Sequence, residues 1–207
     1  MRFEIGDLQE HKKAIESMIL EKKSQGSFTV IDVGGTAAKF NEGVYDFVAD
    51  INAEDSDTNF KMDICEEVQW ERLLEHVQGN GKFDYCICSH TLEDVYNPYL
   101  SLFYFPLIAK AGAILVPNYT TELSHVEDAQ YFGYIHHRYL FKEKDGKLLV
   151  APKMPLVERL IPDHNETKLV NLTIHWEDKI DYTVFMDNYL GPNVQTVANK
   201  FLLEFRD

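Results

Sequence analysis

The sequence is poor in positive charge and in cysteine. Its 207 residues include 20 Lys and Arg against 34 Asp and Glu, which gives a formal net charge of -14, and the basic residues form no cluster. Nucleic acids and anionic membranes are bound through basic surfaces, so neither is an expected partner. The three cysteines, Cys65, Cys86 and Cys88, have no zinc-binding spacing and no evident disulfide pairing. We expect them to be reduced core thiols, which is typical of a cytosolic protein.

Long apolar runs are missing as well. Charged residues and histidine interrupt every apolar stretch near the amino terminus, so we expect no signal peptide, no membrane insertion and a cytoplasmic location. The hydrophobic fraction of 45% and the aromatic fraction of 13% nevertheless favour a folded chain over a disordered one. A chain of this length predicts a single α/β domain over residues 1–207.

Two common phosphate-binding motifs are also absent, although a strand followed by a glycine turn is present. Residues 28–33 are rich in β-branched and aromatic side chains and predict a buried strand of a parallel sheet. This strand includes Asp32 and leads into Gly34, Gly35 and Thr36, a turn whose glycines let a ligand approach the backbone. Neither G-x-G-x-x-G nor G-K-[ST] occurs. The turn therefore suits a nucleoside without a pyrophosphate, which argues against NAD and ATP.

Acids end two further predicted strands. Asp50 closes the strand at 47–49, and Asp63 closes the strand at 60–62. Ligands of open α/β sheets bind outside the carboxyl ends of the strands, and an acid at the second strand commonly accepts hydrogen bonds from ribose hydroxyls. We therefore assign both acids, with the following residues Ile51 and Ile64, to a nucleoside site.

The rest of the chain predicts alternating strands and helices, followed by a more irregular last third. Residues 1–26 contain an amphipathic helix, and residues 118–165 are expected to form a substrate-side insertion or lid. Asp145 and Gly146 predict a hairpin turn between short strands. The other predicted helices cover 66–78, 97–110 and 194–205, and residues 122–131 are expected to form a short helix or a lid. The other predicted strands cover 83–89, 113–117, 133–141, 169–176 and 182–186.

Two segments resemble motifs of the class I S-adenosylmethionine-dependent methyltransferases. Residues 32–36, D-V-G-G-T, resemble the D/E-x-G-x-G turn under the methionine part of the cofactor, with Thr36 in place of the second glycine. Residues 83–94, F-D-Y-C-I-C-S-H-T-L-E-D, resemble the family's fourth motif, F-D-x-[VI]-x-x-x-[HN]-x-L-E-[HD], whose loop lies beside the transferred methyl group.

The resemblance implies a Rossmann-like fold and S-adenosyl-L-methionine as the cofactor. The sheet would be mostly parallel and seven-stranded with an antiparallel last strand, helices would cover both faces, and the two late strands would be the sixth and seventh. The implied cofactor-binding residues are Asp32, Gly34, Gly35, Thr36, Asp50, Ile51, Asp63, Ile64, Ser89, His90 and Leu92.

The segment 133–139, G-Y-I-H-H-R-Y, holds the candidate catalytic residues. His136 and His137 are candidate general bases for an acceptor hydroxyl, and a strand would point them to opposite faces, so that only one serves the pocket. Glu122 and Arg138 would orient the acceptor. Together with S-H-T-L-E-D, this segment resembles a subset of small microbial methyltransferase-like proteins that are often associated with glycan assembly. The expected activity is therefore O-methylation of a small hydroxylated acceptor, most simply a sugar or glycan.

Three alternatives remain open. His90, Asp94, Glu122, His136 and His137 offer metal ligands, but their spacing is not compact, so no metal is predicted. Thr36 and the short stretch after it would also fit a catalytically inert domain that serves as a binding or scaffolding partner. A nicotinamide-dependent oxidoreductase is the third possibility. The oligomeric state is not predicted.

Overall fold

The computed structural model describes residues 1–35, 40–41, 43–127, 129–161, 163–164, 169–185 and 194–205. Within these ranges the strands form a seven-stranded sheet and a separate three-stranded sheet. The larger sheet has the spatial order β1 (Arg2–Gly6), β9 (Asn171–Glu177), β6 (Ala109–Pro117), β5 (Phe83–Ser89), β2 (Val30–Val33), β3 (Phe47–Asp50) and β4 (Asn59–Lys61).

Five neighbouring strands of the large sheet run parallel. β2 pairs in parallel with β3 and β5, β3 with β4, and β5 with β6. β9, the last strand of this sheet along the chain, is antiparallel to both β6 and β1. The predicted Rossmann-like α/β fold is therefore confirmed. β2 is buried along its whole length, as its continuous apolar pattern predicts.

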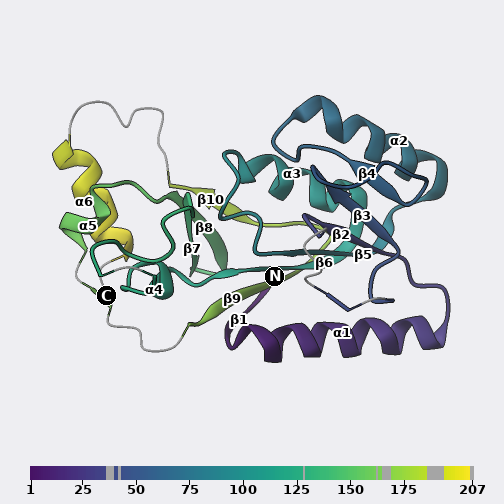
Figure 1. Cartoon of the computed structure of the whole chain (residues 1–207), viewed down its shortest axis with the longest axis horizontal. Coiled ribbons are helices and arrows are strands. Elements are labelled where there is room, and N and C mark those ends of the chain that lie inside the picture. Colours follow the sequence, from purple (N-terminus) through teal and green to yellow (C-terminus); the bar gives the residue numbers. More distant parts are fainter. Residues whose placement is uncertain are drawn as a thin grey trace.

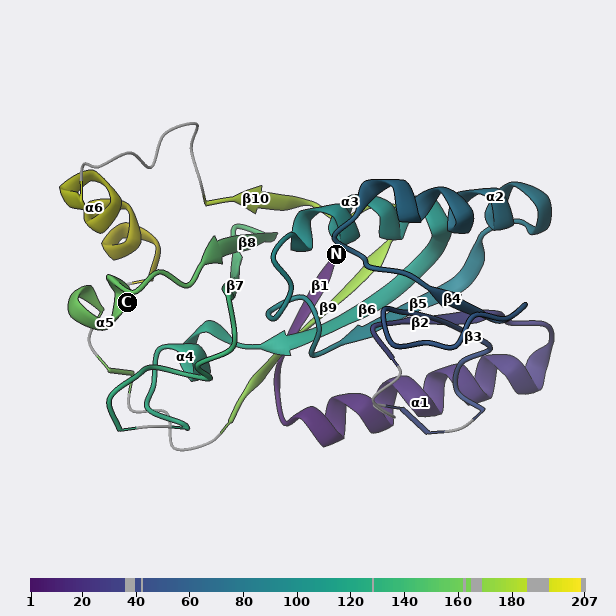
Figure 2. The same cartoon turned by 45° about the horizontal axis from the view of Figure 1, so that its top comes forward.

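Helices cover both faces of this sheet (Figures 1 and 2). α1 (Leu8–Gln25) lies against one face, where Ile15 and Ile19 are buried, and Asp7 caps it by accepting hydrogen bonds from two backbone N–H groups of its first turn. The opposite face carries α2 (Trp70–Asn80), which follows the 3-10 turn Glu67–Gln69, and α3 (Pro98–Ile108).

Two predictions for the outer strands are wrong. The place next to β9 at the sheet edge is taken by the amino-terminal strand β1, which the sequence analysis missed, and not by a late strand. Residues 182–184 form β10 (Tyr182–Val184), which pairs in parallel with β8 of the three-stranded sheet. The predicted end of that strand, Met186, lies outside the described residues.

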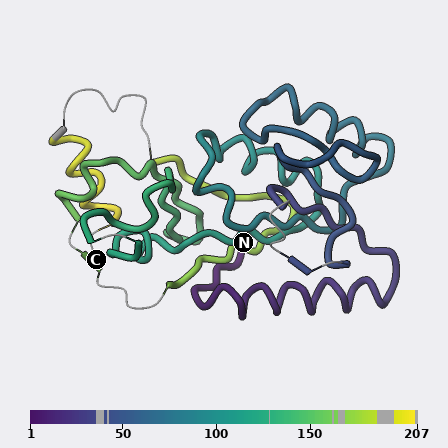
Figure 3. The backbone as a smooth tube through the Cα atoms, in the orientation of Figure 1, coloured from purple at the N-terminus to yellow at the C-terminus, as the bar shows by residue number. Residues whose placement is uncertain are grey.

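The three-stranded sheet belongs to a smaller lobe at the opposite end of the molecule from α2 (Figure 3). Phe185, Phe201 and Phe205 are among the buried residues of its hydrophobic core. Asp145 and Gly146, both with positive φ, form the predicted hairpin turn between two of its strands. The other elements of the lobe are α4 (Tyr119–Glu122), β7 (Tyr139–Lys144), β8 (Lys147–Pro152), α5 (Val157–Leu160) and α6 (Val194–Phe205).

Residues 118–165 contribute α4, β7, β8 and α5 to this lobe. That they act as a lid stays a prediction. For residues 122–131 the expected short helix is wrong, because α4 ends at Glu122 and the described residues after it, up to 131, form no helix, and the alternative of a lid stays a prediction. In the part of the chain that the structure describes, no helix has both the length and the apolar character needed to cross a bilayer. All three cysteines are buried, and none of them is in a disulfide.

Candidate active site

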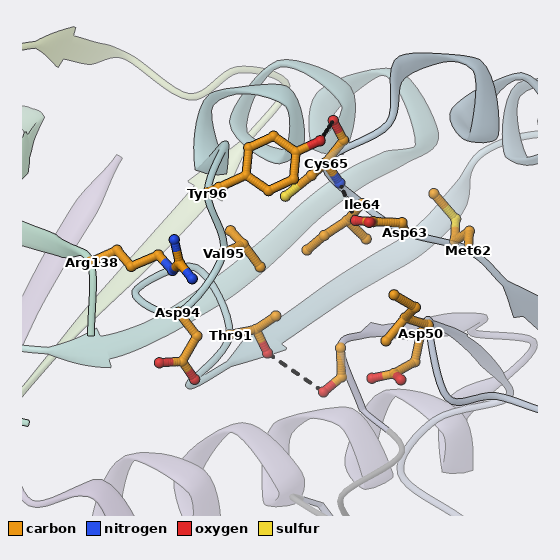
Figure 4. Close-up of a pocket in the computed structure, with 12 residues that line it drawn as sticks. Asp50, Met62, Asp63, Ile64, Cys65, Thr91, Asp94, Val95, Tyr96 and Arg138 are labelled. Atoms are coloured by element: carbon orange, nitrogen blue, oxygen red, sulfur yellow. Dashed lines mark hydrogen bonds between the residues drawn. The ribbon is translucent and has the colours of Figure 1, made fainter. Parts of the chain in front are cut away.

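A cavity of about 250 Å³ opens at the carboxyl ends of β2, β3, β4 and β5 (Figure 4). These strands are neighbours in the parallel part of the sheet, so the segments that follow them meet at one edge. Figure 4 shows Asp50 and Arg138 on opposite sides of the cavity. The lining residues are Gly34, Asp50, Ile51, Met62, Asp63, Ile64, Cys65, Thr91, Asp94, Val95, Tyr96 and Arg138.

The glycine turn after β2 is held tightly in place. Gly34 has φ of +80°, and its N–H donates a hydrogen bond of 2.8 Å to the carbonyl oxygen of Ala49 in β3. A Cβ at Gly34 would overlap the side chain of Thr91, whose hydroxyl lies 3.5 Å from the Gly34 carbonyl oxygen. Glycine is therefore required here by both backbone conformation and packing against Thr91.

Asp32 and Gly35 pack against each other and do not line the cavity. Asp32 is fully buried in β2, and a Cβ at Gly35 would overlap its carboxylate. The predicted cofactor residue Asp32 thus lies under the turn. Thr36, which the sequence also assigned to the cofactor, lies outside the described residues.

Two acids line the cavity at the ends of β3 and β4. Oδ1 of Asp50 accepts a hydrogen bond of 2.7 Å from the backbone N–H of Asn52, and Oδ1 of Asp63 accepts one of 2.9 Å from that of Cys65. Within the described residues, Oδ2 of neither carboxylate accepts a hydrogen bond. Each acid is thus fixed by one oxygen and keeps the other available for a ligand.

Apolar side chains form the remaining walls beside these acids. Ile51 is 56% exposed although it is apolar, and it lines the cavity together with Met62, Ile64 and Val95. Burial raises the pKa of the Cys65 thiol, so this side chain is a neutral part of the wall at physiological pH. An acid edge beside apolar walls matches the two sides of a nucleoside, a hydroxyl-bearing sugar and a flat apolar base.

A second group of side chains centres on Glu122 in α4. Its Oε1 lies 2.7 Å from Nδ1 of His137, and its Oε2 accepts a hydrogen bond of 2.7 Å from Nζ of Lys153. Lys153 also donates a hydrogen bond to the carbonyl oxygen of Tyr134. The side chains of Glu122, His137 and Lys153 are all largely buried. The carboxylate favours the tautomer in which His137 carries its proton on Nδ1 and offers Nε2 as an acceptor.

The pKa values of this pair move in opposite directions. Burial by itself would raise the pKa of Glu122, but its hydrogen bond with His137 and the charge of Lys153 outweigh burial and lower it. Burial by itself would lower the pKa of His137, but its hydrogen bond with Glu122 and the nearby acids Glu93 and Asp94 raise it. Glu122 is therefore a carboxylate that stabilises a proton on its histidine.

The segment that contains the two histidines is a turn and not the predicted strand. β7 begins only at Tyr139, and residues 135–136 form a turn. The rings of His136 and His137 therefore do not point to opposite faces: their Nε2 atoms lie 3.7 Å and 3.6 Å from the same oxygen, Oδ1 of Asp94. The side chain of His136 is 62% exposed and that of His137 only 6%. Asp94 lines the cavity but neither histidine does, so we call the position of the two rings, beside Asp94, the rim of the cavity.

Three predicted residues at and after the end of β5 do not line the cavity. Leu92 is buried in the hydrophobic core, and Ser89 is buried at the end of β5. His90 has φ of +50°, and its Nδ1 lies 3.1 Å from Oε1 of Glu93. It lines a different cavity, beside Thr121 and Tyr134.

The structure thus brings together about half of the predicted cofactor residues. Those that line the cavity are Gly34, Asp50, Ile51, Asp63 and Ile64, and the predicted catalytic residue Arg138 joins them. Asp94 also lines the cavity, and the sequence pointed to it only as a possible metal ligand. The sequence did not indicate the remaining lining residues or Lys153. Met62 and Cys65 flank predicted residues, and Thr91, Val95 and Tyr96 belong to or adjoin the recognised loop, so proximity was the available signal. Lys153 lies in no motif.

The comparisons with known proteins give structural likenesses only. The sequence matches no family model and no curated protein. A magnesium protoporphyrin IX methyltransferase, ChlM, from Synechocystis PCC 6803 with bound SAH is 12% identical, with 64% of this chain and 75% of that chain covered and a TM-score of 0.32. The N-terminal domain of EvdMO1 with SAH bound is 11% identical to this chain. The match covers 83% of this chain and 66% of that one, with a TM-score of 0.30.

A protein from Listeria monocytogenes described as an S-adenosylmethionine-dependent methyltransferase is 11% identical, with 79% of this chain and 98% of that chain covered and a TM-score of 0.33. These TM-scores are low, so the fold assignment rests on the strand order of the chain itself. The chain has a Rossmann-like α/β fold with a mostly parallel seven-stranded sheet, which is the fold that its two motifs predicted.

Proposed function

We propose that this protein is an S-adenosylmethionine-dependent methyltransferase that methylates a hydroxyl group of a small acceptor, a sugar or a glycan. The observation that carries the proposal is the cavity at the ends of four neighbouring parallel strands, with Asp50 and Asp63 at its edge. A carboxylate with a free oxygen suits the two hydroxyls of a ribose, and the apolar walls suit an adenine ring.

The charge of the cavity also favours this cofactor over a dinucleotide. The described lining residues include three acidic side chains, Asp50, Asp63 and Asp94, and one basic side chain, Arg138. A pyrophosphate would be repelled by these acids, whereas the sulfonium of S-adenosylmethionine is a cation that they attract. The same balance argues against the nicotinamide-dependent oxidoreductase.

His137 is the base that we assign to the reaction. S-adenosylmethionine supplies the methyl group, and the protein must align the acceptor oxygen and remove its proton. Glu122 holds Nδ1 of His137, and Nε2 lies on the side of Asp94 at the rim of the cavity. Nε2 would accept the hydroxyl proton as the oxygen attacks the methyl carbon. Glu122 then acts through His137 and does not orient the acceptor as the sequence predicted, while Arg138 remains the acceptor-orienting residue.

A sugar acceptor is supported by the polar groups at the rim. Asp94, His136 and Arg138 offer acceptors and donors to several hydroxyls at once, and a neutral sugar needs no basic surface in a chain with a net charge of -14. The test is to incubate the protein with S-adenosylmethionine and a panel of sugars, nucleotide sugars and phenols. S-adenosylhomocysteine and a product heavier by one methylene group should form with a sugar. Methylation of phenols alone would contradict the acceptor class.

A catalytically inert binding domain is the second candidate, and one contact favours it. Thr91 packs directly over Gly34, on the turn where the methionine part of the cofactor would pass. If the domain has lost cofactor binding altogether, S-adenosylmethionine should bind neither the parent protein nor Thr91→Ala, although the variant lacks the side chain that contacts Gly34. Tighter binding by Thr91→Ala than by the parent would instead show that the contact only restricts an intact cofactor site.

A further inference from the structure

Asp94, His136 and His137 converge at the rim of the cavity. The two Nε2 atoms lie 3.7 Å and 3.6 Å from Oδ1 of Asp94, and the three potential ligand atoms lie within 4.8 Å of one another. Zinc binds histidine nitrogen and carboxylate oxygen at about 2.0–2.2 Å, and tetrahedral ligands at that distance are roughly 3.4 Å apart. The two distances to Asp94 are close to this value, so the three side chains lie near the separations that one bound ion requires.

The surroundings of His137 match those of a metal ligand. Metal-binding histidines typically donate their other ring N–H to a carboxylate or a carbonyl, which fixes the ring and its tautomer. Here Glu122 provides that carboxylate 2.7 Å from Nδ1, and Lys153 holds the second oxygen of Glu122. Nε2 of His137 is therefore fixed toward Asp94, while the exposed ring of His136 closes the group from the solvent side.

We propose that Asp94, His136 and His137 form a binding site for one divalent transition-metal ion of the zinc class. Two imidazoles and one carboxylate favour such an ion over Mg²⁺ or Ca²⁺, which prefer oxygen ligands. Three protein ligands leave a coordination position open, which is typical of sites that also bind a small molecule. Because Asp94 lines the cavity, that position is next to the proposed acceptor.

The metal site goes beyond the proposed function and does not depend on it. Both assign a role to the same atom, Nε2 of His137, so the metal and the acceptor proton compete for it. In the metal-bound protein His137 is not available as a base. Binding of Zn²⁺ is therefore measured without any turnover, and cofactor binding is measured separately on the same samples.

The test is calorimetric titration of chelator-treated, full-length protein with Zn²⁺. One ion should bind per chain, and Mg²⁺ should bind far more weakly. His136→Ala and Asp94→Asn should each weaken Zn²⁺ binding at least tenfold, because each removes one of three ligands. The matched control is His125→Ala, which removes a histidine that lies near Asp163 and outside the group. Thermal unfolding of each variant checks that it is folded.

Glu122→Gln provides an independent variant, since it keeps all three ligands and removes only the carboxylate behind His137. It should weaken Zn²⁺ binding by about 10- to 100-fold. Absence of Zn²⁺ binding, or equal binding by the parent, His136→Ala and Asp94→Asn, would overturn the proposal. A protein that binds S-adenosylmethionine but not Zn²⁺ would refute the metal site alone, and one that binds only Zn²⁺ would refute the proposed function alone.

Discussion

Replacing Asp50 with alanine should weaken S-adenosylmethionine binding much more than it weakens the fold. In the proposed complex the free oxygen of Asp50 accepts one hydrogen bond from the ribose. A hydrogen bond to a charged group contributes about 1.5–3 kcal/mol. Since about 1.4 kcal/mol corresponds to a tenfold change in affinity, the dissociation constant should rise about 10- to 150-fold.

The cost to stability is smaller because, within the described residues, the Asp50 side chain accepts one internal hydrogen bond, from the backbone N–H of Asn52. It contributes about 1 kcal/mol, which lowers Tm by roughly 2–4 °C in a chain of this size. Titration calorimetry and thermal unfolding measure the two effects. Asp57→Ala is the matched control, because Asp57 is exposed in the same loop and does not line the cavity. Equal cofactor affinity in the parent and Asp50→Ala would refute the ribose assignment.

Three further predictions concern the turn, the base and a hydrogen bond in the sheet. Gly34→Val should lower the free energy of unfolding by about 2 kcal/mol or more, because a branched side chain is strained at positive φ and overlaps Thr91. Denaturant unfolding measures this change, and a stability equal to that of the parent would contradict the prediction. His137→Ala should lower turnover by about 10²- to 10⁴-fold with unchanged cofactor affinity, and full turnover would exclude it as the base. Burial alone would raise the pKa of Asp84, but its hydrogen bonds from Lys110 and Thr29 lower it. The ionised Asp84 therefore contributes to stability near neutral pH, and this contribution is lost as the pH falls through its folded-state pKa. In Asp84→Asn the free energy of unfolding should consequently fall less steeply between neutral and acidic pH than in the parent. An unchanged pH dependence would contradict this.

Local patterns in the sequence were sufficient to predict the central strands and most long helices. The strand at 83–89 and the helix at 194–205 match the structure, because a continuous apolar run and an amphipathic period are both local signals. β1 was missed because it is a five-residue edge strand with polar residues, and its partner β9 is far away in the sequence. The placement of β10 likewise depends on its pairing with β8, which no local pattern records.

The site was predictable to the extent that it follows from strand ends. Asp50 and Asp63 meet at the cavity because parallel strands bring their carboxyl ends to one edge. The arrangement of His136 and His137 was not predictable, since an aromatic and β-branched pattern favours a strand, whereas the chain turns after Gly133, which has positive φ. Lys153 reaches Glu122 across 31 positions of the sequence, a tertiary contact without a motif.

The most direct test of the proposed cofactor site is thermal unfolding of the parent protein with S-adenosylmethionine, S-adenosylhomocysteine or NAD⁺. A ligand that binds only the native state at 100 times its dissociation constant stabilises it by about 2.7 kcal/mol. At roughly 2–4 °C for each kcal/mol, this predicts a rise in Tm of about 5–11 °C with either S-adenosyl compound. NAD⁺ should give no rise. No shift with millimolar S-adenosylmethionine, or a shift with NAD⁺ alone, would contradict the proposal that this cavity binds S-adenosylmethionine.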